Sequence, residues 1–206
     1  MIATKYVIGI DEAGRGPLAG PVAVGAVKIS KDFDQDMFKG VRDSKKLTAF
    51  TREKWYRKLC TLRREGILDF AVSFSTEKII DERGIVPAIL SALEDSLDSI
   101  NARPSKCKIL LDGGLRAPEK FYDQKTITRG DESIPLISLA SVVAKVSRDR
   151  LMVRLSKKYP NYGFDVHKGY GTLGHIRVLK KVGLCKLHRR TFCKNFLSVL
   201  RQIPST

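Results

Sequence analysis

The sequence predicts an α/β fold built around a mixed β-sheet. Two segments rich in Val and Ile open the chain, and the turn between them contains several Gly and Pro residues, which is typical of a β-hairpin. Farther along, apolar segments with strand character alternate with segments of helical periodicity. Hairpin strands are antiparallel, whereas strands separated by a helix can be parallel, so this order favours a sheet of mixed direction.

The elements can be placed in chain order. Strands are expected at 5–11, 21–29, 67–75, 107–112 and 121–128. Between them, a helix capped by Thr48 is expected to run to about Arg64, and residues 75–100 are expected to be helical with an interruption near 84–87.

The strongest helical pattern covers residues 136–159 and is expected to stop at Pro160. Its apolar residues form a stripe that we expect to face the core: Leu139, Val142, Val143, Val146 and Val153. A loop at 161–171, a helix capped by Thr172 and a basic stretch complete the chain.

Length and composition favour one globular domain covering residues 1–206. The chain is 43% apolar and 29% charged, which excludes collagen-like and wholly disordered classes. No stretch approaches about 18 consecutive apolar residues, and the N-terminal residues lack the apolar core of a signal peptide. We therefore expect a soluble, cytoplasmic protein whose four cysteines, which form no CxxC pair, are free thiols.

Positive charge is concentrated near the C-terminus. The formal net charge is +16, and residues 145–206 hold 15 Lys and Arg but only two acidic residues, so 13 of the 16 excess charges lie there. A polyanion such as a nucleic acid is the natural partner of such a segment, although a solubilising surface is an alternative. Residues from about 160 to 206 are expected to form a basic, mainly helical C-terminal region.

Three acidic sites lie in apolar surroundings. Asp11 and Glu12 end the first strand, Asp112 ends the fourth, and Asp149 flanks the apolar stripe of the long helix. If the two strands are neighbours, Asp11 and Asp112 converge at one sheet edge, and the helix could bring Asp149 beside them. Carboxylates about 4 Å apart repel by roughly 4 kcal/mol at an effective dielectric constant near 20, so such a cluster favours protons or cations. Oxygen ligands without histidine favour Mg²⁺ or Mn²⁺.

Two of these acids also allow a simpler interpretation. Adjacent strand residues point to opposite faces, so Glu12 joins Asp11 only if the strand ends or bends there. Asp149 could instead pair with Lys145, which lies one helical turn before it.

The glycine-rich segment after the first strand does not fit a nucleotide triphosphatase. Arg15 and Gly16 stand where a phosphate-binding loop needs Lys and Ser or Thr. Gly14, Arg15 and Gly16 do offer backbone amides that can approach a phosphate or a sugar hydroxyl closely.

An opening signature and five further motifs, in order along the chain, resemble bacterial ribonuclease HII, a type 2 ribonuclease H. The opening signature is Gly9-Ile-Asp-Glu-Ala-Gly-Arg-Gly-Pro-Leu-Ala-Gly-Pro-Val22. The others are Asp43-Ser-Lys-Lys-Leu-Thr48, Leu111-Asp-Gly-Gly114, the segment from Ala140 to Arg150, and Gly169-Tyr-Gly-Thr172 with His188-Arg-Arg-Thr-Phe192. Together they extend across most of the chain.

The resemblance implies a ribonuclease H-like fold, with a five-stranded mixed sheet flanked by helices and a helical C-terminal region. It assigns catalysis and metal binding to Asp11, Glu12, Asp112 and Asp149, which would hold two Mg²⁺ or Mn²⁺ ions. The implied activity is hydrolysis of the RNA strand of RNA/DNA hybrids and of the phosphodiester 5′ to single ribonucleotides embedded in duplex DNA. The products would carry 3′-hydroxyl and 5′-phosphate ends, and the biological role would be ribonucleotide removal from DNA.

The resemblance also implies a substrate site. Gly14, Arg15, Gly16 and Tyr170 correspond to the elements that read the ribonucleotide at the RNA to DNA junction. Further substrate contacts, mainly to phosphates, are expected from Ser44, Lys45, Lys145, Lys168, Arg189 and Arg190. We expect a monomer, and no protein partner or membrane association is evident from the sequence.

Two other functions stay open at this point. A different metal nuclease of ribonuclease H-like fold, such as a resolvase or an integrase-type enzyme, would share the carboxylates but not the requirement for a 2′-hydroxyl. A nucleic-acid binding module would hold its acids for structural reasons and would not cleave.

Overall fold

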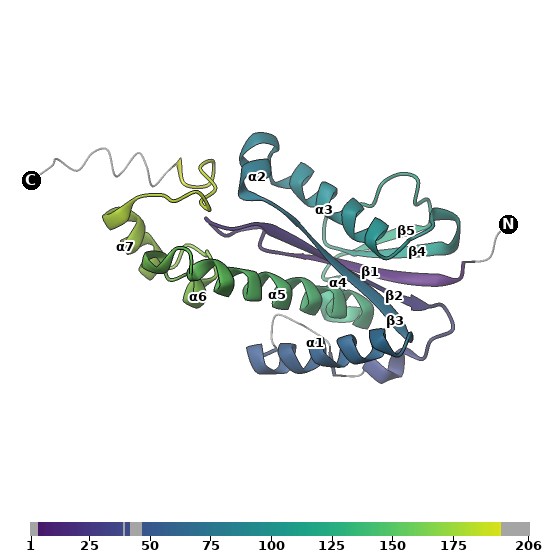
Figure 1. Ribbon diagram of the computed structural model, residues 1–206. Coiled ribbons are helices and arrows are strands. Elements are labelled where there is room, and N and C mark those ends of the chain that lie inside the picture. Colours follow the sequence, from purple (N-terminus) through teal and green to yellow (C-terminus); the bar gives the residue numbers. More distant parts are fainter. Residues whose placement is uncertain (1–3, 39, 42–46, 195–206) are drawn as a thin grey trace, which may run out of the picture.

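A five-stranded mixed sheet forms the centre of the molecule. The computed structural model describes residues 4–38, 40–41 and 47–194. The strands are β1 (Tyr6–Ala13), β2 (Val22–Ser30), β3 (Leu68–Ser75), β4 (Cys107–Asp112) and β5 (Gln124–Ile127), in the order β3-β2-β1-β4-β5 (Figure 1). β1 is antiparallel to β2 and parallel to β4; β2 and β3 are antiparallel, and β4 and β5 are parallel. The predicted α/β class and the mixed sheet are confirmed.

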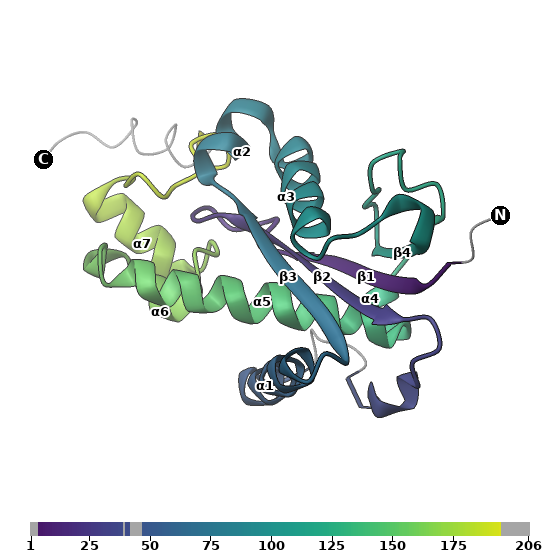
Figure 2. The same cartoon turned by 45° about the vertical axis from the view of Figure 1, so that its right-hand side comes forward.

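Helices cover both faces of this sheet, with α3 (Ile85–Ser99) on one face and α1 (Ala49–Arg64) and α5 (Pro135–Ser156) on the other. The other helices are α2 (Glu77–Arg83), α4 (Gly130–Ser133), α6 (Phe164–His167) and α7 (Leu173–Val182). Short 3-10 turns occur at Gln35–Phe38, Pro104–Lys106 and Pro160–Tyr162. One core cluster lies between the sheet and α3, and a second lies between the sheet and α1 and α5 (Figure 2).

The pattern along β1 explains which face carries the site. Ile8 and Ile10 are fully buried in the core on the α3 side, so Gly9 and Asp11 belong to the α5 face. A Cβ at Gly9 would lie 2.4 Å from the carbonyl oxygen of Leu136, and one at Gly25 would lie 2.4 Å from that of Ala140. The backbone of α5 therefore rests directly on the sheet at these two glycines.

The long helix differs from its prediction near its C-terminal end. It ends at Ser156, and the chain turns before Pro160, which opens a 3-10 turn. Four residues of the predicted inward stripe are buried, but Val153 is 41% exposed because it lines an open cavity beside the first turn of α1.

The described part of the C-terminal region packs around aromatic rings. α6 lies within the segment predicted as a loop, and Thr172 caps α7 as predicted, its hydroxyl accepting a hydrogen bond from the backbone of His175. His175 and His188 are buried with their Nε2 atoms 3.1 Å apart, and the ring of His167 stacks on His175 at 4.0 Å.

All four cysteines have free thiols, as predicted. Within the described ranges, every helix is too short or too polar to cross a bilayer.

Candidate active site

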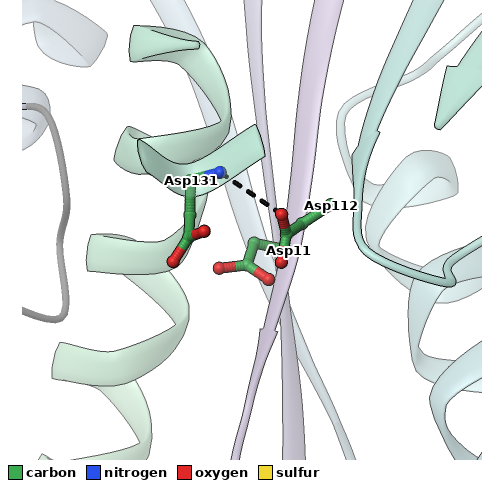
Figure 3. Close-up of side chains that lie close together, drawn as sticks. All are labelled: Asp11, Asp112 and Asp131. Carbon is green, nitrogen blue, oxygen red and sulfur yellow. Dashed lines mark hydrogen bonds between the residues drawn. The ribbon is translucent and has the colours of Figure 1, made fainter. Parts of the chain in front are cut away.

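Three carboxylates from different elements converge at one end of the sheet. Asp11 comes from β1, Asp112 from the end of β4 and Asp131 from α4, and one oxygen of each lies within 4.8 Å of the others (Figure 3). The last paired residues of β1 and β4 are Ile10 and Leu111, so the next residue on each strand is an aspartate. The predicted convergence of Asp11 and Asp112 is thereby confirmed.

Asp131 reaches the cluster through the turn that follows β5. Its backbone N–H donates to Asp112 Oδ1 at 3.3 Å, which fixes α4 against the end of β4. The hydroxyl of Ser138, in the first turns of α5, donates to the backbone carbonyl of Asp131. Asp131 was not among the residues predicted from the sequence. The same pattern, an acidic residue beside glycine near the end of a predicted strand, was present: Gly130 and Asp131 follow the fifth predicted strand, and Asp112 ends the fourth next to Gly113.

The electrostatics of this cluster favour a cation. Asp11 is 3% exposed, and its burial raises the pKa of its carboxyl group well above the ordinary value. A hydrogen bond from the Ser141 hydroxyl lowers this pKa in part, and the negative charges of Glu12 and Asp112 raise it further. Hard oxygen donors of this kind suit Mg²⁺ or Mn²⁺, so the residues fit the divalent metal that the sequence predicts.

Glu12 stands beside the cluster. β1 continues without a break to Ala13, so Glu12 has the opposite orientation to Asp11 along the strand. Its Oε1 accepts a hydrogen bond from Arg15 Nε at 3.0 Å, while its side chain still contributes to the wall of the same pocket. Any role of Glu12 as a metal ligand stays a prediction.

Asp149 does not belong to the cluster, contrary to the prediction. Lys145 Nζ donates to Asp149 Oδ1 at 2.8 Å, which is the simpler pairing that the sequence also allowed. Asp149 lies eight residues after Ser141, the residue that contacts Asp11, and therefore about 12 Å farther along the helix. It lines a neighbouring cavity of about 500 Å³ with Arg150 and Lys168 instead.

A single pocket joins the acidic cluster to the glycine segment. Its volume is about 450 Å³. The residues around it are Asp11, Glu12, Ala13, Gly14, Arg15, Gly16, Arg52, Asp112, Ser141, Lys145 and Tyr170. Thus Gly14, Arg15, Gly16, Tyr170 and Lys145, all predicted to contact substrate, share a pocket with two of the clustered aspartates.

Besides Ala13, two residues of this pocket, Arg52 and Ser141, were not predicted from the sequence. Arg52 lies in the first turns of α1, where nothing in the local pattern distinguishes it from the other basic residues of that helix. Ser141 has the sequence signature of an ordinary small core residue, because it stands within the apolar stretch of α5.

Tyr170 and Lys145 form one side of this pocket. Tyr170 is 39% exposed, and Lys145 Nζ lies 5.4 Å from the centroid of its ring. The Lys145 ammonium group and the Tyr170 ring therefore attract each other at the rim of the pocket, where both are accessible to a ligand.

Arg189 lies inside the protein, contrary to the prediction of a phosphate contact. Its side chain is fully buried and donates three hydrogen bonds to backbone carbonyls of the glycine segment. A guanidinium group enclosed in this way cannot reach a phosphate at the surface.

The remaining predicted contacts are scattered. Lys168 lines the neighbouring cavity, and its Nζ donates to the carbonyl of Asp165. Arg190 is exposed, and its backbone N–H donates to Asp81 at 2.8 Å. Ser44 and Lys45 lie outside the described residues.

Comparisons with known proteins agree with this geometry. A sequence model of the family Ribonuclease HII matches residues 8–195. A ribonuclease HII from Caldicellulosiruptor bescii is 42% identical over 195 residues, which is 95% of this chain and 90% of the relative.

Two solved structures share the fold over nearly the whole chain. The ribonuclease H2 of Pyrococcus horikoshii has a TM-score of 0.73 and 30% identity, covering 96% of this chain and all of that one. A ribonuclease HII of Archaeoglobus fulgidus, solved in complex with PCNA, has a TM-score of 0.75 and 26% identity, covering 96% of this chain and 98% of that one. The ribonuclease H-like fold expected from the resemblance is confirmed, and with the clustered aspartates beside the glycine segment, the chain belongs to the ribonuclease HII family.

Proposed function

We propose that this ribonuclease cleaves the RNA strand of RNA/DNA hybrids and the phosphodiester 5′ to single ribonucleotides embedded in duplex DNA. The products would carry 3′-hydroxyl and 5′-phosphate ends, and the biological role would be removal of ribonucleotides from DNA. One observation carries the proposal: Asp11 and Asp112 of the acidic cluster line the same pocket as the glycine segment and Tyr170. Carboxylates that would bind metal and groups that can contact a sugar thus line one pocket.

Asp11, Asp112 and Asp131 are the residues that would hold divalent metal, with Mg²⁺ or Mn²⁺ as the fitting ions and Glu12 as an additional ligand. Asp131 takes the place that the sequence analysis gave to Asp149. Two such ions, when bound, supply activation of a water nucleophile and neutralisation of charge on the leaving oxygen. Ser141 holds the Asp11 carboxylate by a hydrogen bond, which keeps it aimed at the cluster.

Recognition of the ribonucleotide would use the glycine segment and Tyr170, which line the same pocket. The 2′-hydroxyl both donates and accepts a hydrogen bond and is the one group that distinguishes RNA from DNA. Backbone groups of Gly14, Arg15 and Gly16 can pair with it, and the half-exposed Tyr170 ring can pack on the adjacent sugar. A site built around this hydroxyl disfavours DNA because its polar groups would lose their partner there.

Phosphate contacts would come from basic side chains around the pocket. Lys145 and Arg52 line it, and the exposed residues of α7 and the following segment extend the positive surface. Each neutralised phosphate contributes about 0.9 to the slope of log affinity against log salt concentration on duplex DNA. Binding that does not change between low and moderate salt would contradict this assignment.

The decisive experiment uses a labelled DNA duplex with one ribonucleotide and its all-DNA twin, each with Mg²⁺, Mn²⁺ or chelator. We expect a metal-dependent cut on the 5′ side of the ribonucleotide and an intact twin. Equal cleavage of both duplexes would favour a broader nuclease of the same fold, and tight binding without cleavage would favour a binding module. Asp11→Asn is the matched variant, expected to abolish cleavage while it retains hybrid binding.

Tyr170→Ala tests the reading of the sugar separately from the chemistry. We expect a reduced preference for the ribonucleotide duplex over its twin, with the metal requirement retained. An unchanged preference would remove Tyr170 from the substrate site. We further propose that the chain acts as a monomer on duplex substrates, which light scattering with and without the duplex will test.

A further inference from the structure

Two fully buried arginines hold the segment that follows β1. Arg148 on α5 and Arg189 near the C-terminus have no exposed side-chain surface. Their hydrogen bonds end on backbone carbonyl oxygens: Arg189 donates to Gly14 (2.7 Å), Arg15 (2.9 Å) and Gly20 (2.9 Å), and Arg148 donates to Pro21 (2.8 Å), Lys168 (3.0 Å) and Ala19 (3.1 Å). Burying charged groups is unfavourable, so this arrangement requires a compensating benefit. Burial accordingly lowers the pKa of Arg189 to about 9.

The bonds from Arg189 fix the direction of two peptide groups. In a trans peptide, the C=O of one residue and the N–H of the next point in opposite directions. Because the carbonyls of Gly14 and Arg15 point at Arg189, the N–H groups of Arg15 and Gly16 point away from it.

The pocket borders this segment on a side that Arg189 does not occupy. Gly14, Arg15 and Gly16 line it, whereas Arg189 does not. Gly14 adopts a φ of +89°, and a Cβ there would lie 2.1 Å from the Nε of Arg148, so this position is pressed against the buried guanidinium. Gly16 is exposed, and a Cβ there would meet no atom within 4 Å. The segment is thus packed tightly on its inner side and open on its outer side.

We propose that Arg189 is a positioning residue for ribonucleotide recognition, which aims the amides of Arg15 and Gly16 into the pocket by holding the carbonyls of Gly14 and Arg15. The inference rests on the proposed function, in which these backbone groups read the 2′-hydroxyl. Arg189 touches neither substrate nor metal in this role. It contacts none of the three clustered aspartates, so it acts on selectivity and leaves metal binding intact.

The test compares Arg189→Ala with Leu97→Ala. Leu97 is a fully buried residue of α3 in the core between this helix and the sheet, so its truncation destabilises the fold without removing a hydrogen bond to the glycine segment. For Arg189→Ala we expect kcat/KM on the ribonucleotide duplex to fall roughly 10- to 100-fold, as for a displaced positioning group. The Mn²⁺ concentration for half-maximal activity should stay within about two-fold of the wild-type value.

Two further readouts separate positioning from general instability. Millimolar guanidinium should restore part of the activity of Arg189→Ala, because it can occupy the vacated position, whereas ammonium at the same concentration and guanidinium with Leu97→Ala should have no such effect. The affinity ratio between the ribonucleotide duplex and its all-DNA twin, measured with Ca²⁺ in place of the catalytic metal, should fall toward one in Arg189→Ala only.

Each outcome has a distinct meaning. If the wild-type protein itself fails to prefer the ribonucleotide duplex, the proposed function fails, whatever the variant does. If the wild type discriminates and Arg189→Ala discriminates equally well, the positioning role is refuted. If Arg189→Ala does not fold, Arg189→Lys replaces it; one ammonium group cannot reproduce the planar fork that spans three carbonyls, so the same loss of preference is expected. Full discrimination by Arg189→Lys would also refute the proposal.

Discussion

Gly25 sets how closely α5 approaches the strands that carry Asp11 and Asp112 of the acidic cluster. It is the partner of Asp11 across β1 and β2, and a Cβ added there would lie 2.4 Å from the carbonyl oxygen of Ala140 and 3.1 Å from the backbone nitrogen of Ala144. Ordinary contacts of a Cβ begin near 3.4 Å, so in Gly25→Ala the helix must move by about 1 Å. Both obstructing atoms belong to backbone, so no side chain can rotate away to relieve the clash.

The expected loss of stability follows from this overlap. Overpacking of a tight core typically costs about 1–3 kcal/mol. For a chain of this size each kcal/mol lowers the melting temperature by about 2–4 °C, so we expect a decrease of roughly 2–12 °C. The displacement also pulls Ser141 away from Asp11, since Ser141 directly follows Ala140 on the helix. The affinity for Mn²⁺ should therefore fall as well.

Thermal unfolding followed by circular dichroism, together with calorimetric Mn²⁺ titration, measures both effects. Gly114→Ala is the matched control, because a Cβ there meets nothing within 4 Å and the residue does not need a positive φ. Its stability should change by no more than about 0.5 kcal/mol. A Gly25→Ala protein with the melting temperature and Mn²⁺ affinity of this control would refute the direct packing of α5 on the sheet.

Three other predictions concern the acidic cluster and the histidines. In steady-state cleavage assays, Asp131→Asn should lower kcat by a factor of about 100 or more, and Asp149→Asn by less than about five-fold. Equal losses of kcat would show that Asp149 contributes to catalysis as much as Asp131 does. Because metal binding must displace the proton held by the raised pKa of Asp11, calorimetric Mn²⁺ affinity should weaken as pH falls, and an affinity independent of pH would contradict the buried carboxylate. Burial lowers the pKa values of His175 and His188 from 6.5 to about 4, so the unfolded chain binds protons at a higher pH than the folded protein does. The free energy of unfolding should therefore fall by about 1–3 kcal/mol per histidine between pH 6.5 and 4. Urea titrations that give no such decrease would refute the burial of these histidines in the neutral form.

The strands and the first two aspartates were accessible from the sequence because each follows a local rule. An apolar run that ends in an acid beside glycine marks Asp11 and Asp112, and neighbouring parallel strands bring such ends together. Asp131 obeys the same rule, but its strand, β5, is only four residues long and largely polar, so the signal was weaker.

Asp149 and Arg189 illustrate what local patterns do not determine. The periodicity of α5 indicates which face of the helix carries Asp149. How far Asp149 lies from the sheet residues, however, depends on where the helix packs on the sheet, and the close contacts at Gly9 and Gly25 determine that position. Arg189 has the appearance of any cation in a basic segment, and only the tertiary structure encloses it. A basic residue at the surface and one that binds buried carbonyls have the same sequence signature.

The contact between Arg189 and Gly14 also has a consequence for biosynthesis. The two residues are 175 positions apart, so Arg189 is synthesised long after the glycine segment. At elongation rates of about 5–20 residues per second, roughly 10 to 35 seconds separate them on the ribosome. A nascent chain can therefore form the hairpin of β1 and β2 well before Arg189 is available to hold the carbonyl of Gly14.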